Sequence, residues 1–388
     1  MKSRRLAWPI RLGVVAFPLT AQANVGTPLI WVTGFHLLLG NLFLGLAEGA
    51  LLARLYSLPK RRCALVMIAA NYFSAWVGGV LIGGWLVDAV PMDLNNGWRW
   101  FWLLVVLAYL MTVVIEWPFV ALCLRGTRDR FRRSLQASFI TQSASYLVLF
   151  GAYWIGSGTS LYTRMTIVSP TELSLPPNVW VYYLALNDGS VHRRRLDGTE
   201  DRKLLEVSAS NHNDRLLIQS SETGENRCDL VVRVEADDGK FPRYVTVLTN
   251  LPSNTVMDGP KEGESYRTRS TGMNFGVVHG IGGDTNSAWS FRTGFWAVQG
   301  LSGSNARTGE SLNFSYETPF RQWPIRNAVR LPSDHVLFQL GWEQICLLEP
   351  ATRKVALLWP GKGPVPVLET PIIGSRPGVD GLVLPPKQ

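Results

Sequence analysis

Long apolar runs fill the first 160 residues of the chain. Four of them, at residues 29–55, 64–87, 98–124 and 135–155, reach the length of about 20 residues that a helix needs to cross a bilayer. We therefore predict a membrane domain of four transmembrane helices over residues 24–160, built as two hairpins.

Polar positions interrupt these runs in an approximate repeat. A glutamate, a basic turn and an amide–x–x–serine group occur twice, and the members are Glu48, Asn71, Ser74, Glu116, Gln142 and Ser145. The repeat predicts that the two hairpins are related. A carboxyl group inside a bilayer costs about 2.5 kcal/mol or more on insertion scales, so each glutamate needs a partner or a function.

Two roles for these groups remain open. They could form hydrogen bonds between helices, which contribute about 0.6 kcal/mol each on average. Alternatively, Glu48 and Glu116, together with His36, could line a proton or solute path, because a buried ionisable residue is a candidate for function. The small-residue pairs Gly45-xxx-Gly49 and Gly79-xxx-Gly83 predict close helix packing in either case.

From residue 166 onward, short alternating runs are separated by Gly, Asp, Asn and Pro, which is typical of an all-β domain. We assign residues 161–388 to this domain. Its clearest unit is a strand at 179–186, an Asn-Asp-Gly-Ser turn at 187–190 and a return strand at 191–196. Glycine supplies the positive φ that such a tight hairpin turn requires.

This unit, which continues through Leu-Asp-Gly-Thr to residue 205, resembles one blade of the TolB-type or WD40-like β-propellers. Residues 230–239 and 336–358 are similar to weaker copies. At about 45 residues per blade, the resemblance implies four or five blades and a binding platform rather than an enzyme. An open propeller and a β-sandwich are the alternatives.

Charge adds an orientation to this architecture. The chain has a net charge of +9, and its first 160 residues carry the whole surplus, mostly in the loops at 54–62 and 125–133. Positive loops stay in the cytoplasm, so both mature termini and the β domain are expected outside. Because membrane orientation explains the surplus, we expect no nucleic-acid partner.

The N-terminus carries the features of a secretory signal. Residues 1–23 combine basic positions, a short apolar run and an Ala-Gln-Ala cleavage site. We predict a cleaved signal peptide and hence a bacterial inner-membrane location, with an uncleaved cytoplasmic lead-in as the alternative.

Candidate chemistry in the β domain is sparse. The histidines are scattered, no CxxC occurs and the glycine-rich stretch 279–284 lacks the residues of a phosphate loop, so no metal, cofactor or catalytic residue is predicted. Three questions stay open: whether Cys228 and Cys346 are bonded, whether residues 193–195 meet an anionic polymer or lipid headgroup, and whether an aromatic group is a sugar platform or core. That group is Trp289, Phe291, Phe295 and Trp296.

Two functional hypotheses follow. The first is a non-enzymatic binding or assembly module, anchored in the lipid bilayer, whose β domain recognises an envelope protein, a polymer or a second copy of the chain. The alternative is a small transporter subunit or proton-linked relay that uses Glu48 and Glu116.

Overall fold

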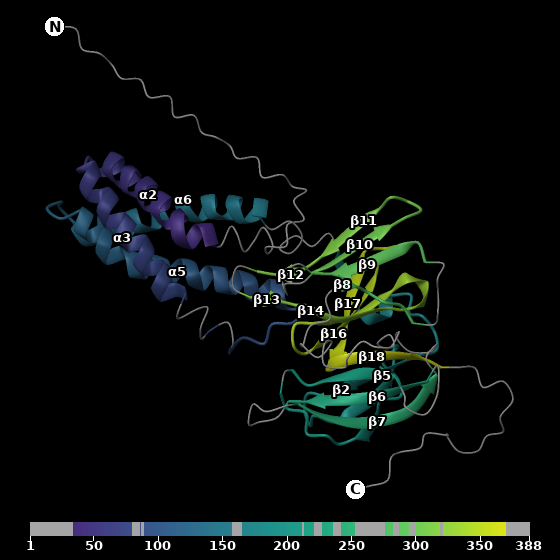
Figure 1. The fold of residues 1–388 in the computed structure, drawn as a ribbon. Helices are drawn as coiled ribbons and strands as arrows, with labels where there is room; N and C mark the ends of the chain where they lie inside the picture. Colours follow the sequence, from purple (N-terminus) through teal and green to yellow (C-terminus); the bar gives the residue numbers. More distant parts are fainter. Residues whose placement is uncertain are drawn as a thin grey trace.

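The computed structural model describes residues 34–79, 86, 89–156, 165–211, 213–220, 227–235, 242–252, 276–281, 287–294, 300–318 and 321–369. They form a helix bundle that lies beside a group of β-sheets (Figure 1). The predicted signal segment, residues 1–23, lies outside the described residues.

The described part of the bundle contains four α-helices. They are α2 (Asn41–Tyr56), which continues the π-helical turn η1 (His36–Gly40), α3 (Lys60–Gly78), α5 (Gly97–Cys123) and α6 (Arg130–Gly156). Consecutive helices pack as the hairpins α2–α3 and α5–α6. The two hairpins contact each other where α3 packs against α5 and where α2 packs against α6. The pairing into two hairpins is therefore confirmed.

The prediction of four transmembrane helices is wrong. Within the described residues, two helical stretches, His36–Tyr56 and Gly97–Cys123, are long and apolar enough to cross a membrane. Lys60–Arg62 belong to the first turn of α3, and Arg130, Arg132 and Arg133 belong to the first turn of α6, so these basic residues of the predicted loops lie inside helices. Polar residues interrupt both helices further along. Residues 80–85 and 87–88, the end of the second predicted span, lie outside the described residues.

Glycine brings α2 and α3 into backbone contact. A Cβ atom on Gly45 would lie 2.5 Å from the Cα of Ile68, and one on Gly49 would lie 2.6 Å from the Cα of Ala64. Close packing at this pair is thus confirmed. Gly79 has nothing within 4 Å of such an atom, and position 83 lies outside the described residues.

The strands that the structure describes in the β domain form five sheets. The largest has the order β1 (Thr166–Ile167), β17 (Lys354–Pro360), β16 (Gln344–Glu349), β15 (Val336–Leu340) and β14 (Ile325–Arg330). A second has the order β11 (Ser311–Phe314), β10 (Leu301–Asn305), β9 (Trp289–Thr293) and β8 (Gly276–Val277). β12 (Tyr316–Glu317) pairs with β13 (Gln322–Trp323).

The remaining strands form two further sheets. One has the order β18 (Lys362–Leu368), β2 (Val179–Leu184), β3 (Val191–Arg195) and β4 (Arg202–Leu205). The other has the order β5 (Arg215–Ser220), β6 (Arg227–Val234) and β7 (Arg243–Pro252). Short 3₁₀ turns, η3 (Pro170–Glu172) and η5 (Pro332–Asp334), connect strands. Among the strands described here by name, every pairing is antiparallel except that of β1 with β17.

The larger sheets stack face to face, and β2 shows how. Trp180, Tyr182 and Leu184 point into a core shared with β5–β7, whereas Val181 and Tyr183 point into a core shared with β15–β17. The other face of β15 and β16 shares a third core with β9–β11. Central strands are therefore buried on both faces, as the period of two in a strand allows.

The predicted hairpins are confirmed, but the described residues form no closed propeller or barrel, so the predicted fold class is wrong. Hairpins β2–β3 and β16–β17 pair as the turn residues indicate, and Gly189 adopts φ +63° in the first turn. The strands that complete these sheets come from far along the chain: β18 joins β2, and β1 joins β17. Turn residues report local pairing and carry no information about such distant partners.

All four cysteines are free and buried. Cys228 lies in the core beside β5–β7, and Cys346 lies in the core beside β9–β11. The alternative of a disulfide between them is therefore excluded.

The segment before α5 fixes the bundle to the β domain. Val90, Met92 and Leu94 belong to the same apolar core as β9–β11 and β15–β16. The backbone N–H of Leu94 donates to Oε1 of Gln344 at 2.7 Å, and the hydroxyl of Tyr316 lies 3.3 Å from the carbonyl oxygen of Asp93. The two parts thus share a packed, hydrogen-bonded joint.

Gly45→Ala should destabilise the protein, because the new methyl group would overlap the α3 backbone. Overpacking of this kind costs about 1–3 kcal/mol. We expect a lower Tm in thermal unfolding of the purified protein. Gly151→Ala is the matched control, since a Cβ there meets nothing within 4 Å and alanine favours a helix. Equal Tm values for the two variants would contradict close packing at Gly45.

Candidate functional site

The bundle brings together all six polar residues of the sequence repeat. Each helix contributes: Glu48 from α2, Asn71 and Ser74 from α3, Glu116 from α5, and Gln142 and Ser145 from α6. All six side chains are buried, with Glu116 at 0% and Glu48 at 2% exposure. The amide and the serine in each pair are three residues apart, so both point from one helix face into the bundle interior.

Each glutamate is held by both hairpins. Within the first hairpin, Nδ2 of Asn71 donates to Oε2 of Glu48 at 2.6 Å, and Ser145 of the second hairpin donates to Oε1. Glu116 has the equivalent partners: Nε2 of Gln142 lies 2.5 Å from its Oε2, and Oγ of Ser74 lies 2.5 Å from its Oε1. The serine of each hairpin thus binds the glutamate of the other hairpin, so the cluster has an approximate two-fold arrangement.

Gln142 breaks this symmetry by joining the two carboxyl groups. Its Nε2 is also 3.4 Å from Oε1 of Glu48. Glu48 consequently has three donors from three residues, whereas Glu116 has one amide donor and one hydroxyl partner. The two glutamates therefore occupy different hydrogen-bonding environments.

A cavity of about 270 Å³ lies between the helices and reaches Glu116. Besides members of the cluster, its polar lining includes His36, Asn41, Thr112, Tyr146 and Tyr153. His36 is half-buried, and its Nδ1 lies 3.0 Å from the hydroxyl of Tyr153. Glu48 is not among the lining residues, so Glu116 alone of the two carboxyl groups contacts this space.

Three of these lining residues were missed from the sequence: Thr112, Tyr146 and Tyr153. Helical spacing is the signal for the two tyrosines, since Gln142, Tyr146, Leu149 and Tyr153 follow one another at intervals of three or four residues along α6. Thr112 precedes Glu116 by four residues on α5, which places both on one helix face.

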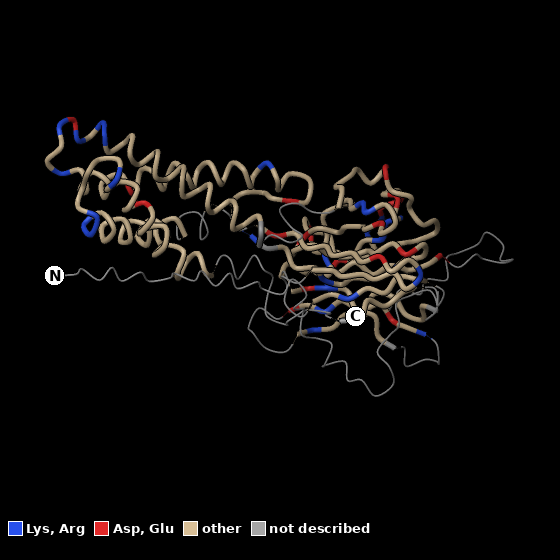
Figure 2. Tube along the Cα trace, turned by 90° about the horizontal axis from the view of Figure 1, so that it is seen from above, with Lys and Arg blue, Asp and Glu red and all other residues tan. Residues whose placement is uncertain are grey.

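The opposite end of the bundle is closed by apolar packing. Its core comprises Leu52, Ala53, Cys63, Met67, Ala70, Val120, Cys123, Leu124 and Ala137. Beyond it, Arg62 donates to the carbonyl oxygen of Leu122 at 2.6 Å, and Arg130 donates to that of Ala121 at 2.8 Å. Cationic side chains stabilise the free carbonyl groups at the end of α5. Figure 2 shows Lys and Arg gathered at this end, remote from the β domain.

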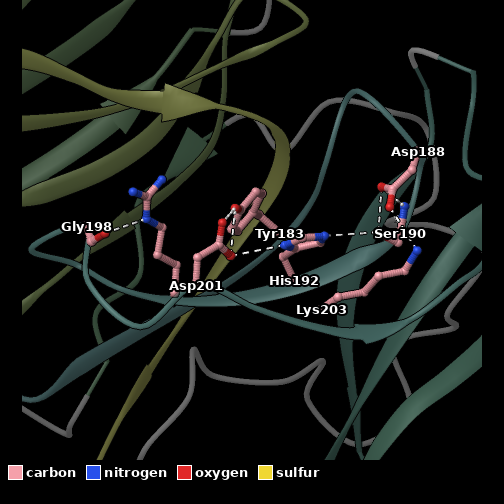
Figure 3. Close-up of polar contacts among 8 residues, drawn as sticks. Tyr183, Asp188, Ser190, His192, Gly198, Asp201 and Lys203 are labelled. Carbon is pink, nitrogen blue, oxygen red and sulfur yellow. Dashed lines mark hydrogen bonds and ion pairs between the residues drawn. The ribbon is translucent and has the colours of Figure 1, made fainter.

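The β domain contains a second polar group on β2–β4 that resembles a catalytic triad (Figure 3). His192 places Nδ1 3.0 Å from Oδ1 of Asp201 and Nε2 3.1 Å from Oγ of Ser190. Ser190, however, is fully buried and donates its proton to Oδ1 of Asp188 at 2.5 Å. A nucleophile must be accessible and must transfer its proton to the base. This arrangement therefore holds a turn together and does not make Ser190 a nucleophile.

The basic residues 193–195 are engaged within the domain. Arg193 and Arg195 stack over Trp180 at 4.1 and 4.6 Å, and Arg195 also forms an ion pair with Glu200 at 2.7 Å. Arg194 donates to the carbonyl oxygen of Gly198 at 2.8 Å. These internal contacts favour a structured strand face over a site for an anionic polymer or headgroup.

The other sequence candidates have structural roles where they are described. Trp289 and Phe291 are buried and stacked, with ring centroids 5.6 Å apart, so they belong to the core. Phe295 and Trp296 lie outside the described residues. The backbone of His279 accepts a hydrogen bond from Arg330, and the described residues contain no group of side chains suited to a metal ion.

No protein-family model matches the chain, and the comparison with curated proteins gives no match.

Removing the two exchanged serines tests whether the cluster acts as one unit. Ser74→Ala and Ser145→Ala each leave a buried carboxyl oxygen with one partner fewer, which should cost about 1–3 kcal/mol. Because Gln142 links the glutamates, the double variant should depart from additivity by about 0.5 kcal/mol or more. Denaturant unfolding measures this, with the exposed Ser143→Ala as control. Additive effects would show two independent sites.

Asp188→Asn should make the Tm of the protein depend less steeply on pH in the acid range. The Ser190 hydroxyl, and then the Lys203 ammonium, hold the pKa of Asp188 below its ordinary value. A lowered folded-state pKa stabilises the fold above the ordinary value of about 3.9, and this contribution is lost as the pH falls further. We therefore expect the Tm of the wild type to fall more steeply than that of the variant between about pH 4 and pH 2. Parallel curves would contradict this role, and Glu310→Gln is the control.

Proposed function

We propose that this chain is a membrane protein whose helix bundle takes up a proton at Glu116 and holds Glu48 as the paired carboxylate, forming a proton-linked relay. The β domain serves as a fixed platform outside the bilayer. One observation carries the proposal: two buried carboxyl groups from related hairpins share the amide of Gln142, and one of them, Glu116, lines a cavity between the helices.

Hydrogen-bond counting supports a proton on Glu116. Ser74 has one hydroxyl proton and two acceptor oxygens within reach, Oε1 of Glu116 at 2.5 Å and the carbonyl oxygen of Asn71 at 3.1 Å. A single hydroxyl proton can serve only one of these oxygens. If Glu116 is protonated, its O–H donates to Oγ of Ser74, and the Ser74 hydroxyl donates to the carbonyl oxygen of Asn71, so both contacts are hydrogen bonds. Glu48 then remains a carboxylate with three donors. Ionising both groups would place two like charges together in an apolar bundle, which is costly.

The surface of the bundle favours a lipid environment. Two helices are long and apolar enough to cross a bilayer. Large apolar side chains stand exposed on the bundle, including Leu38 at 73%, Trp76 at 74% and Leu147 at 73%. Soluble monomers rarely expose contiguous apolar surface of this kind, whereas lipid covers it.

Charge distribution suggests an orientation in a bacterial inner membrane. Lys and Arg gather at the end of the bundle remote from the β domain (Figure 2). By the positive-inside rule this end faces the cytoplasm, and the β domain lies on the extracytoplasmic side, as do both mature termini. The cavity at His36 and Tyr153 would then open toward the β-domain side, where the platform could bind an envelope protein or polymer.

Proton flux into lipid vesicles tests the relay. Purified protein is reconstituted with an entrapped pH-sensitive dye, and a pH gradient is imposed. We expect wild-type vesicles to lose the gradient faster than empty ones. Glu116→Gln should slow this by about ten-fold or more, because general acid–base groups contribute factors of that size. Glu310→Gln, an exposed β-domain residue, should leave the rate unchanged.

Two results would contradict the relay. One is a wild-type rate equal to that of empty vesicles, and the other is a Glu116→Gln rate equal to that of the wild type.

A further inference from the structure

Arg326 is a buried cation for which the described residues supply no ion-pair partner. It lies on β14 with 4% exposure, and its Nε has no hydrogen-bond partner. Within the described residues its guanidinium forms no ion pair, and its closest aromatic contact is Trp342, whose ring centroid lies 3.5 Å away. Burying an unpaired charge is costly, so such a group calls for a ligand or a function.

The neighbours of Arg326 add to the positive charge. Burial, and then the nearby charge of Arg215, lower the pKa of Arg326 to about 10, so the group remains protonated at neutral pH. Arg215 begins β5 and is 3% exposed, and Lys362 begins β18 and is 5% exposed. β18 packs against both β14 and β5. Three buried cations therefore come from three different sheets at this part of the stack.

The nearby acidic residues do not neutralise Arg326. Asp214, which is also buried, accepts the backbone N–H groups of Asn211 at 2.8 Å and Glu235 at 2.7 Å. Its charge acts on Lys362, as does that of Glu343. Among the described residues, no carboxylate forms an ion pair with Arg326, so its positive charge is not compensated there.

We propose that Arg326, supported by the charges of Arg215 and Lys362, binds an oxyanion of the phosphate type. Trp342 covers the flat face of the guanidinium, and stacking of this kind leaves the N–H groups at the edge available for bidentate recognition. Trp342 is itself half-exposed in the turn between β15 and β16, so the site lies close to solvent. This inference does not depend on the proton relay in the helix bundle.

Thermal unfolding of the full-length protein tests the site. In a chloride buffer, Arg326→Gln should be at least as stable as the wild type, because the substitution removes an unpaired cation. Inorganic phosphate at matched ionic strength should raise the Tm of the wild type by about 3 °C or more at saturating concentration. It should not raise the Tm of Arg326→Gln. Arg292→Gln changes an exposed arginine and should respond as the wild type does.

A second variant and a second ligand complete the test. Arg326→Lys keeps the charge without the planar fork, so its phosphate affinity should fall by about ten-fold. Stabilisation by glycerol 3-phosphate as well as inorganic phosphate would support an esterified ligand, and stabilisation by phosphate alone would support the free anion. A wild type that phosphate does not stabilise would overturn the proposal. So would a full phosphate response in Arg326→Gln, or an Arg326→Gln variant that is unfolded in chloride.

Discussion

Burial of two carboxyl groups is the constraint on which the helix bundle depends. In an apolar interior every carboxyl oxygen needs a partner, and here each glutamate takes one partner from its own hairpin and at least one from the other. Neither hairpin could bury its glutamate alone. α3 and α6 supply the amide and hydroxyl groups that meet this requirement. These groups, together with the basic residues of their first turns, make the two helices more polar than α2 and α5.

The joint before α5 extends this constraint to the β domain. Residues 90–94 are packed into the core of the sheets, and α5, which carries Glu116, begins directly after them at Gly97. The hydroxyl of Tyr316 lies so close to Gly97 that a Cβ atom there would be 2.1 Å from it. A movement of the sheets would therefore be transmitted to α5. In the proposed relay, this joint offers a direct mechanical link between what binds the platform and the position of Glu116.

The sequence predicted the site better than the fold around it. All six cluster residues were recognised, because a glutamate in an apolar helix and an amide–x–x–serine group are conspicuous and repeat. The helix hairpins and the strands β2, β3, β16 and β17 were also recognised, since helix pairing across short turns and hairpin turns are local signals. The predicted number of transmembrane helices was wrong because the basic residues at Lys60 and Arg130 lie inside helices. The prediction of a propeller was wrong because β1 and β18 join sheets whose other strands are distant from them in the sequence.

In the proposed relay, Glu116 carries the exchangeable proton and Glu48 does not. Difference infrared spectroscopy of the reconstituted protein distinguishes the two groups, because a protonated carboxyl group has a C=O stretch that an ionised one lacks. We expect a carboxylic acid band at neutral pH that disappears in Glu116→Gln and persists in Glu48→Gln. A band that survives in Glu116→Gln, or that is absent from the wild type, would contradict it.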